Sequence, residues 1–193
     1  MVVLFAFFVS SSLFSVLYKG EKRHSNRTYK QVLANGLIGV ILSILYLVYN
    51  DELFKLLYTI SFAVSTADTW AGEIGKLSKY KPRNIVTWKQ TDYGLSGSVT
   101  VLGTIASFGG SVFISLFLFL NYHVILWGFL GSIVDSFLGT LQVKYKVAHG
   151  GIVENVIDKQ DIEQVLGISW LSNNVVNFTS NVIIVFIAYL VLN

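Results

Sequence analysis

The sequence predicts an all-α protein, a polytopic transmembrane bundle of about six helices with both termini outside. Of its 193 residues, 53% are hydrophobic and only 13% are charged, whereas soluble domains carry about 25% charged residues. Apolar stretches of membrane-spanning length recur along the whole chain, and the positive charges gather after every second one. The chain contains no cysteine, which excludes disulfides, thiolate metal sites and cysteine nucleophiles.

A helix needs about 20 mostly apolar residues to cross the hydrocarbon layer of a membrane. Six stretches meet this requirement, at roughly 2–18, 31–49, 53–75, 99–120, 122–142 and 167–192. They leave little chain for anything else. We therefore expect residues 1–193 to form a single transmembrane domain.

The first stretch is apolar enough to be taken for a signal peptide. It has no basic segment in front, and its positive charges follow it, which is typical of a helix that enters from outside. A short turn at Asp51 and Glu52 separates the second and third stretches. The fifth carries Asp135, and the sixth carries spaced asparagines.

Lysines and arginines form three clusters, which follow the first, third and fifth stretches. The positive-inside rule places these connections, near 19–30, 77–98 and 143–166, in the cytoplasm. Thirteen of the 14 basic residues obey it, and only Lys55 lies elsewhere. The net charge of +3 thus reflects membrane orientation, and we expect no nucleic-acid binding.

Carboxylates inside the third and fifth stretches are the main indication of a functional site. Asp68 and Asp135 each open an Asp-(Thr/Ser)-x-x-Gly pattern, and Glu73 follows the first. A charge near the bilayer centre costs roughly 2.5–3.5 kcal/mol, so such residues face a partner, an ion or a substrate. In this topology the two stretches run parallel, and both aspartates lie roughly 10–13 Å below the cytoplasmic surface. We expect them to aim at one point.

Amide side chains from two further stretches reach a similar depth. Asn174 and Asn177 lie on one face of the sixth stretch, because residues three apart share a helix face. Asn35 lies near the cytoplasmic end of the second stretch. Polar groups from four helices thus converge on the inner third of the membrane. The alternative that each asparagine only bonds a neighbouring helix stays open.

The longest connection, residues 77–98, ends in a turn rich in glycine and serine. These residues are Gly94, Ser96, Gly97 and Ser98. Exposed N–H groups before a helix attract anions, and the helix dipole adds to the attraction. With Lys89 nearby, we predict a phosphate cradle here, with a generic flexible loop as the alternative.

The connection 143–166 carries four further acids. We expect them to form the solvated face of a short surface helix. They are Glu154, Asp158, Asp161 and Glu163.

Carboxylates without cationic partners, facing a lysine and an anion-binding turn, suit a Mg²⁺-bound polyphosphate. Mg²⁺ favours one or two carboxylates together with phosphate oxygens and water. Phosphoryl transfer needs mainly positioning and charge neutralisation. The sequence therefore predicts a membrane enzyme that takes a nucleotide from the cytoplasm and acts on a lipid phosphate or alcohol.

Several blocks of the sequence resemble the phytyl-phosphate kinase family of integral membrane proteins, which has plant plastid, animal and archaeal members. The blocks are 31–36, 65–75, 82–89, 94–100, 135–142 and 173–177. The resemblance implies phosphorylation of an isoprenyl monophosphate to its diphosphate, with Mg²⁺ and with CTP or another nucleoside triphosphate as donor. It also implies distant kinship with CTP-dependent polyprenol kinases and phosphatidate cytidylyltransferases. Family members usually carry further N-terminal spans.

The resemblance assigns roles to the candidate site residues. Asp68 and Glu73 would bind metal and nucleotide, with Asp135 as the second metal ligand or base. Lys89 would act in catalysis by holding phosphate, and the turn at Gly94 to Ser98 would bind phosphate as well. The residues that would position the acceptor are Asn35, Asn174 and Asn177.

One structural condition and several alternatives stay open. Asp68 and Glu73 are about 140° apart on a straight helix, so they share a metal only if the helix breaks near Gly72. The alternatives are a CTP-dependent cytidylyltransferase or polyprenol kinase, a proton- or cation-coupled transporter, and a scaffold. The isoprenoid length, the nucleotide and a homo-oligomeric state stay open. The absence of a transit peptide favours an archaeal plasma membrane with the site facing the cytoplasm.

Overall fold

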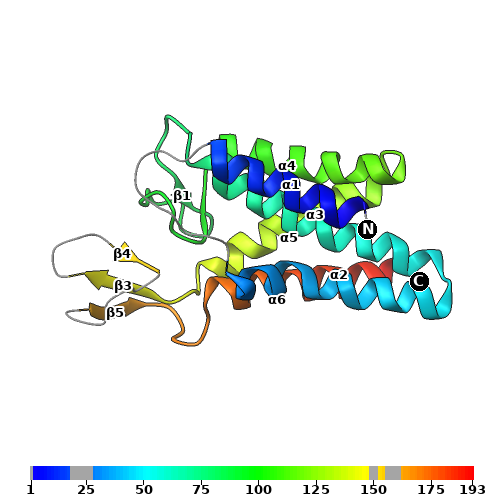
Figure 1. Cartoon of the computed structure of the whole chain (residues 1–193). Coiled ribbons are helices and arrows are strands. Elements are labelled where there is room, and N and C mark those ends of the chain that lie inside the picture. Colours follow the sequence, from blue (N-terminus) through cyan, green and yellow to red (C-terminus); the bar gives the residue numbers. More distant parts are fainter. Residues whose placement is uncertain (1, 18–27, 148–151, 155–161) are drawn as a thin grey trace.

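The computed structural model describes residues 2–17, 28–147, 152–154 and 162–193. Within these residues the chain forms a bundle of six α-helices with short strands at one end (Figure 1). Both chain termini lie towards the opposite end (Figure 1). The helices are α1 Val2–Leu17, α2 Tyr29–Tyr49, α3 Glu52–Gly75, α4 Val101–Ser115, α5 Tyr122–Gly139 and α6 Asn173–Leu192.

The six helices correspond to the six predicted stretches and confirm the helical membrane bundle, although α6 begins at Asn173 rather than near 167 and α4 with η1 ends at Leu118 rather than near 120. Four of them are long and apolar enough to cross a membrane: α2, α4 with its 3₁₀ extension η1 (Leu116–Leu118), α5 and α6. Helix α1 is apolar but shorter in its described part. Helix α3 is less apolar because it carries Lys55, Asp68 and several hydroxyl side chains.

Helix α3 forms the centre of the bundle and packs against each of the other five helices. A central helix is screened from lipid by its neighbours, so it can carry polar groups without exposing them to hydrocarbon. Its middle part, from Leu57 to Ala67, is buried almost without interruption. Close approach of the neighbours requires glycine. A Cβ on Gly110 of α4 would lie 3.2 Å from the Ala67 backbone, and one on Gly128 of α5 would lie 2.7 Å from Ala63 Cβ.

Local capping explains where the helices begin. Thr28 forms a capping box with Gln31 at the start of α2, so the Gln31 side chain is used for helix capping. Asp51 accepts a hydrogen bond from the Leu53 N–H at 2.9 Å and caps α3. Thr100 caps α4 in the same way, and Asn121 caps α5. These caps fix the helix starts to within one or two residues of the predicted stretches.

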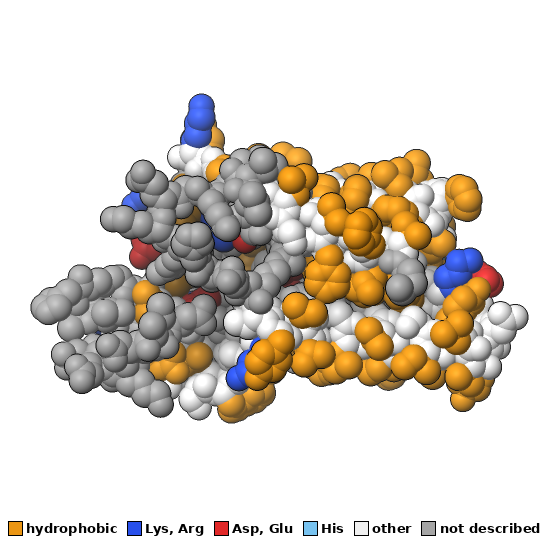
Figure 2. Space-filling view, viewed as in Figure 1, with side chains coloured by type: hydrophobic (Ala, Val, Ile, Leu, Met, Phe, Trp, Pro, Cys, Tyr) orange, Lys and Arg blue, Asp and Glu red, His pale blue; other side chains and the backbone are white. Residues whose placement is uncertain are grey.

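The bundle surface is suited to lipid. Hydrophobic side chains cover most of the helical part, and charged side chains are seen mainly towards the two ends (Figure 2). Large apolar side chains such as Phe5, Leu47 and Val101 are more than two-thirds exposed. Such an extended apolar surface is characteristic of a membrane or protein interface.

The strands form two small antiparallel sheets at one end of the bundle. Strand β1 (Arg83–Asn84) pairs with β2 (Ser98–Val99). Strand β3 (Lys144–Val147) lies between β4 (Ile152–Val153) and β5 (Ile162–Leu166). The prediction of a short surface helix in the connection 143–166 is therefore wrong. Glu163 lies in β5 and Glu154 directly follows β4, while Asp158 and Asp161 fall outside the described residues.

Candidate active site

Helices α3 and α5 bring the two intramembrane aspartates together. The carboxyl group of Asp68 lies within hydrogen-bonding reach of the carboxyl group of Asp135. Asp135 is only 8% exposed, and the Ser180 hydroxyl of α6 donates to its Oδ2 at 2.8 Å. Three helices therefore supply this site, which we call the acid pair (Asp68 and Asp135). The structure places the aspartates at one point, as the sequence predicted, and their chemical role stays a prediction.

No cationic side chain of the described residues balances the charge of the acid pair. Neither aspartate forms an ion pair in the part of the chain that the structure describes. Two carboxylates in direct contact cannot both be ionised unless a proton or a cation lies between them. The arrangement is therefore suited to binding a cation or to sharing a proton.

A Mg²⁺ ion fits the acid pair under one condition. Within the described ranges, no group of three or more acidic, histidine or cysteine side chains forms a metal-binding cluster. Two carboxylates suffice for Mg²⁺ when phosphate oxygens and water complete the coordination. The pair thus fits a Mg²⁺ ion that arrives with a polyphosphate, rather than a metal held by the protein alone.

Glu73 does not join the acid pair. Helix α3 continues to Gly75 without the break near Gly72 that a shared metal would require. The Glu73 carboxylate instead lies 3.3 Å from the Lys76 ammonium, and both side chains are partly exposed. The metal site that the sequence predicted with three acids therefore contains two, Asp68 and Asp135.

Two of the three predicted asparagines, Asn35 and Asn177, bond each other across two helices. Asn177 Nδ2 donates to Asn35 Oδ1 at 3.3 Å, which joins α6 to α2. Asn181, which is 1% exposed, donates to the Ser61 carbonyl and to Ser65 Oγ on α3. The amide oxygens of Asn177 and Asn181 are buried and find no hydrogen-bond partner among the described residues. These oxygens are free to accept a bond from a substrate or water.

Asn174 also lies on α6 and is half-buried. No described contact joins its side chain to the acid pair, so its predicted role in positioning the acceptor stays a prediction.

The glycine-serine turn is fixed against the end of α5. Gly94 and Gly97 have φ angles of +84° and +79°, which favour glycine. A Cβ on Gly97 would lie 2.7 Å from the Thr140 backbone nitrogen. A Cβ on Gly139 would in turn lie 2.8 Å from the Gly97 nitrogen, and Gly139 follows Asp135 by four residues, about 6 Å along the helix. The turn therefore lies about one helical turn from the acid pair.

The turn binds an anion that belongs to the chain itself. The Ser96 N–H donates to Glu154 Oε1 at 2.6 Å, and the Ser96 hydroxyl donates to Oε2 at 2.8 Å. The Gln142 side-chain amide adds a third bond, to Oε2 at 2.9 Å. Burial raises the pKa of Glu154, while the Ser96 bonds and the positive charge of Lys144 oppose this rise. We call the donors Ser96, Gln142 and Lys144 the anion site.

Two predicted phosphate-binding side chains lie elsewhere. Lys89 is exposed, and within the described residues only its backbone carbonyl is hydrogen-bonded, by the Asn84 N–H at 2.9 Å. The Ser98 hydroxyl accepts a bond from the Thr91 hydroxyl at 2.7 Å and so holds the loop together. The lysine whose charge acts on the bound carboxylate is Lys144.

Sequence reasoning missed the roles of Lys144 and Glu154. Lys144 was counted with the orientation charges, and Glu154 with the solvated acids. A separation of 58 residues between Ser96 and Glu154 left no pattern that joins them.

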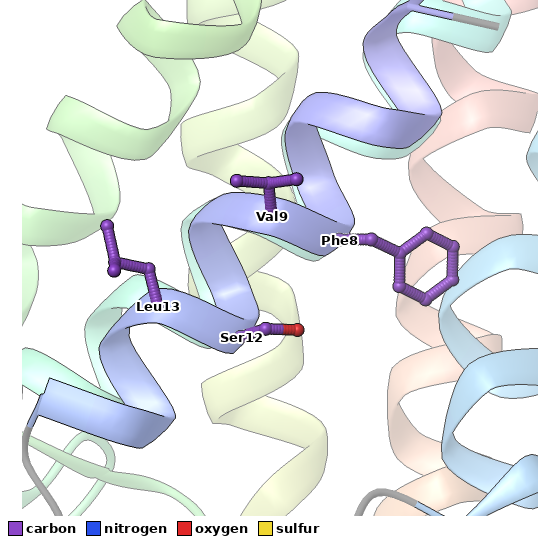
Figure 3. Close-up of a pocket in the computed structure, with 4 residues that line it drawn as sticks. All are labelled: Phe8, Val9, Ser12 and Leu13. Carbon is purple, nitrogen blue, oxygen red and sulfur yellow. The ribbon is translucent and has the colours of Figure 1, made fainter.

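Two apolar depressions run along α1 and are separate from the polar site. The first is lined by Phe8, Val9, Ser12 and Leu13 (Figure 3). The second extends to Trp70 of α3 and Phe113 of α4. No predicted site residue lines either depression, so neither is part of the acid pair or the anion site.

Comparisons with known proteins place the chain among membrane proteins. The family profile described as "Integral membrane protein DUF92" matches residues 1–185. An uncharacterized membrane protein of Methanocaldococcus jannaschii is 34% identical over 73% of this chain and 64% of its own length. Protein PGR of Arabidopsis thaliana is 27% identical over 92% of this chain and 76% of its own. The chloroplastic protein VTE6 of the same plant is 28% identical over 81% of this chain and 45% of its own.

The chain thus spans less than two-thirds of the archaeal relative and less than half of VTE6. No solved structure matches it.

Proposed function

Because the chain belongs to the DUF92 family of integral membrane proteins, as the sequence blocks suggested, we propose that it is a membrane kinase. It would transfer a phosphoryl group from a nucleoside triphosphate to an isoprenyl monophosphate and produce the diphosphate. One observation carries this proposal. Asp68 and Asp135 are in contact, and this contact lies about one turn of the α5 helix from the glycine-serine loop that binds an anion.

The two parts of the site would hold different parts of the substrates. The Ser96 N–H and hydroxyl, the Gln142 amide and the Lys144 ammonium would bind phosphate oxygens of the nucleotide. The acid pair would hold Mg²⁺, which would supply charge neutralisation during transfer. The lipid tail would lie between or beside the helices, with its phosphate directed at the acid pair.

The phosphoryl transfer needs no reactant other than the nucleotide and the acceptor. A bond forms between an oxygen of the acceptor phosphate and the γ-phosphorus of the nucleotide. The bond from the γ-phosphorus to the bridging oxygen breaks, and the nucleoside diphosphate leaves with that electron pair. A phosphate acceptor that is fully ionised needs no base. An alcohol acceptor must lose its proton, and then a carboxylate of the acid pair would take it.

The orientation of this site follows from the charges. The strands and the anion site lie at one end of the bundle, where α3 and α5 end and lead into the predicted basic connections 77–98 and 143–166 (Figure 1). If those connections face the cytoplasm, the nucleotide reaches the anion site directly. An archaeal plasma membrane is the compartment that we propose for this arrangement.

A product assay tests the proposal. Purified protein in lipid nanodiscs is incubated with labelled CTP or ATP, Mg²⁺ and geranylgeranyl phosphate. The kinase yields isoprenyl diphosphate and nucleoside diphosphate, and Asp68→Asn and Asp135→Asn each abolish this product. Glu52→Gln is the control, because this carboxylate is exposed at the start of α3, away from the anion site. Release of pyrophosphate with a CDP-lipid would instead indicate a cytidylyltransferase.

A second candidate function is cation or proton transport. Polar groups continue from the acid pair along α6 and α3, where the Ser61 hydroxyl and the Asn181 amide oxygen are buried without hydrogen-bond partners in the part of the chain that the structure describes. Intramembrane ionisable groups with such neighbours often mark proton or ion pathways. Proteoliposomes with a trapped pH indicator would show ion-coupled proton uptake, lost in Asp68→Asn, if the chain is a transporter. Product formation without such uptake excludes it.

A further inference from the structure

The anion site is built and occupied by a side chain of the same protein. Three hydrogen bonds of 2.6, 2.8 and 2.9 Å converge on the two carboxylate oxygens of Glu154. Their donors come from the turn before α4 and from the end of α5, so they are far apart in the sequence. Donors held by rigid elements keep their positions when their acceptor leaves.

A buried lysine beside the Glu154 carboxylate points to a further ligand of this site. Lys144 is 6% exposed, and among the described residues its ammonium makes only long hydrogen bonds, 3.4 Å to the Gly139 carbonyl and 3.5 Å to the Thr140 carbonyl. A buried ammonium with such weak bonds retains donors for a more highly charged anion.

The chemistry of these donors matches that of phosphate. A backbone N–H, a hydroxyl, an amide and an ammonium are groups that recur in phosphate sites. A carboxylate presents two oxygens and one negative charge. A phosphate group presents three oxygens and up to two charges, so it can engage the same donors and also the lysine.

We propose that Glu154 is an internal competitor that occupies the anion site until a phosphate group of the substrate displaces it. The identity of the substrate rests on the proposed function, whereas the competition itself does not. In the absence of substrate, Glu154 satisfies donors whose burial without a partner would otherwise destabilise the site. Displacement exposes the carboxylate to water and opens the site next to the acid pair.

Binding of inorganic pyrophosphate to the whole purified chain tests this inference. Titration calorimetry without Mg²⁺ and without lipid measures the anion site alone. Glu154→Gln removes the competing charge and should lower the dissociation constant of pyrophosphate about tenfold, the scale of one charge-assisted hydrogen bond. Glu163→Gln is the matched control, because this exposed residue lies in the neighbouring strand β5 and should leave the constant unchanged.

Further variants assign the effect to the site. Lys144→Met introduced into the Glu154→Gln variant should cancel the gain, because the ammonium supplies part of the phosphate attraction. If the gain persists, pyrophosphate binds elsewhere and the inference is overturned. Equal or weaker binding by Glu154→Gln also overturns it. If Glu154→Gln fails to fold, Glu154→Asp replaces it, because it withdraws the carboxylate by one methylene. This variant must still lower the dissociation constant of pyrophosphate, by less than about tenfold.

Two ligand arms identify the source of the phosphate. CTP without lipid and geranyl phosphate without nucleotide are each titrated into both proteins, and the ligand whose affinity rises in Glu154→Gln is the one that displaces Glu154. A gain for pyrophosphate alone still identifies Glu154 as the competitor and overturns only the assignment of the displacing phosphate to these two substrates. Failure of the kinase proposal is distinguishable. In that case no isoprenyl diphosphate forms, but Glu154→Gln still binds pyrophosphate more tightly than the wild type.

Discussion

The pair of variants Gly94→Ala and Gly97→Ala tests how the anion site is held. Both glycines have nearly the same φ, +84° and +79°. Alanine at either position therefore incurs a similar backbone cost of about 1–2 kcal/mol for left-handed conformation. The surroundings differ, because a Cβ on Gly94 meets nothing within 4 Å, whereas one on Gly97 lies 2.6 to 2.9 Å from Thr140 atoms, including its backbone.

Overpacking against backbone atoms that cannot rotate away costs typically another 1–3 kcal/mol. We therefore expect Gly97→Ala to lose about 2–5 kcal/mol of unfolding free energy and Gly94→Ala about 1–2 kcal/mol. The turn packs against the end of α5 at Gly97. Gly97→Ala should therefore also weaken pyrophosphate binding at least tenfold, while Gly94→Ala changes it by less than threefold.

Denaturant unfolding in mixed micelles, followed by the fluorescence of the four tryptophans, measures the stability difference. Titration calorimetry measures pyrophosphate binding on the same samples. Equal losses for the two variants would refute the reasoning, since the contact with Thr140 would then contribute nothing. Unchanged binding by a folded Gly97→Ala variant would show that the turn is not part of the anion site.

Three further predictions follow from the same geometry. Ser180→Ala removes the hydroxyl that donates to Asp135 at 2.8 Å and should lower kcat about five- to tenfold at unchanged nucleotide KM, near the 1–1.5 kcal/mol of one hydrogen bond. Glu73→Gln should change the Mg²⁺ dependence by less than twofold, because Glu73 pairs with Lys76 at the surface; a large loss would return Glu73 to the metal site. Burial raises the pKa of Glu154 above its ordinary 4.5, so its stabilising contribution is fully present below pH 4.5 and is lost as the pH rises through the folded-state pKa. Denaturation from pH 4 to 8 should therefore show the wild type losing stability relative to Glu154→Gln as the pH rises, and a change in the opposite direction would contradict the assigned cause.

The helices and the meeting of the aspartates were predictable because both depend on local or regular features. The third stretch was expected at 53–75 and is Glu52–Gly75, since an apolar run and the capping carboxylate of Asp51 define its start. The rise of a helix is constant, so the depth of Asp68 and Asp135 follows from residue numbers and the charge clusters. Their contact then required only that the two parallel helices be neighbours.

The anion site was only partly predictable because its contacts join distant segments. The glycine-serine turn was recognised from composition, but its partner Glu154 was assigned to a solvated helix face. A short sheet, rather than a helix, brings Glu154 back to Ser96. Lys144 was likewise counted by charge, whereas its burial depends on the chain folding back over the end of α5. Such contacts have no periodicity in the sequence.

Cation binding tests the central claim most directly. Electron paramagnetic resonance of Mn²⁺, used in place of Mg²⁺, is recorded with the purified protein and pyrophosphate. Our account predicts one bound Mn²⁺ that depends on pyrophosphate and is lost equally in Asp68→Asn and Asp135→Asn. Undiminished Mn²⁺ binding by either variant, with its fold intact, would contradict the claim that the two aspartates hold a cation together.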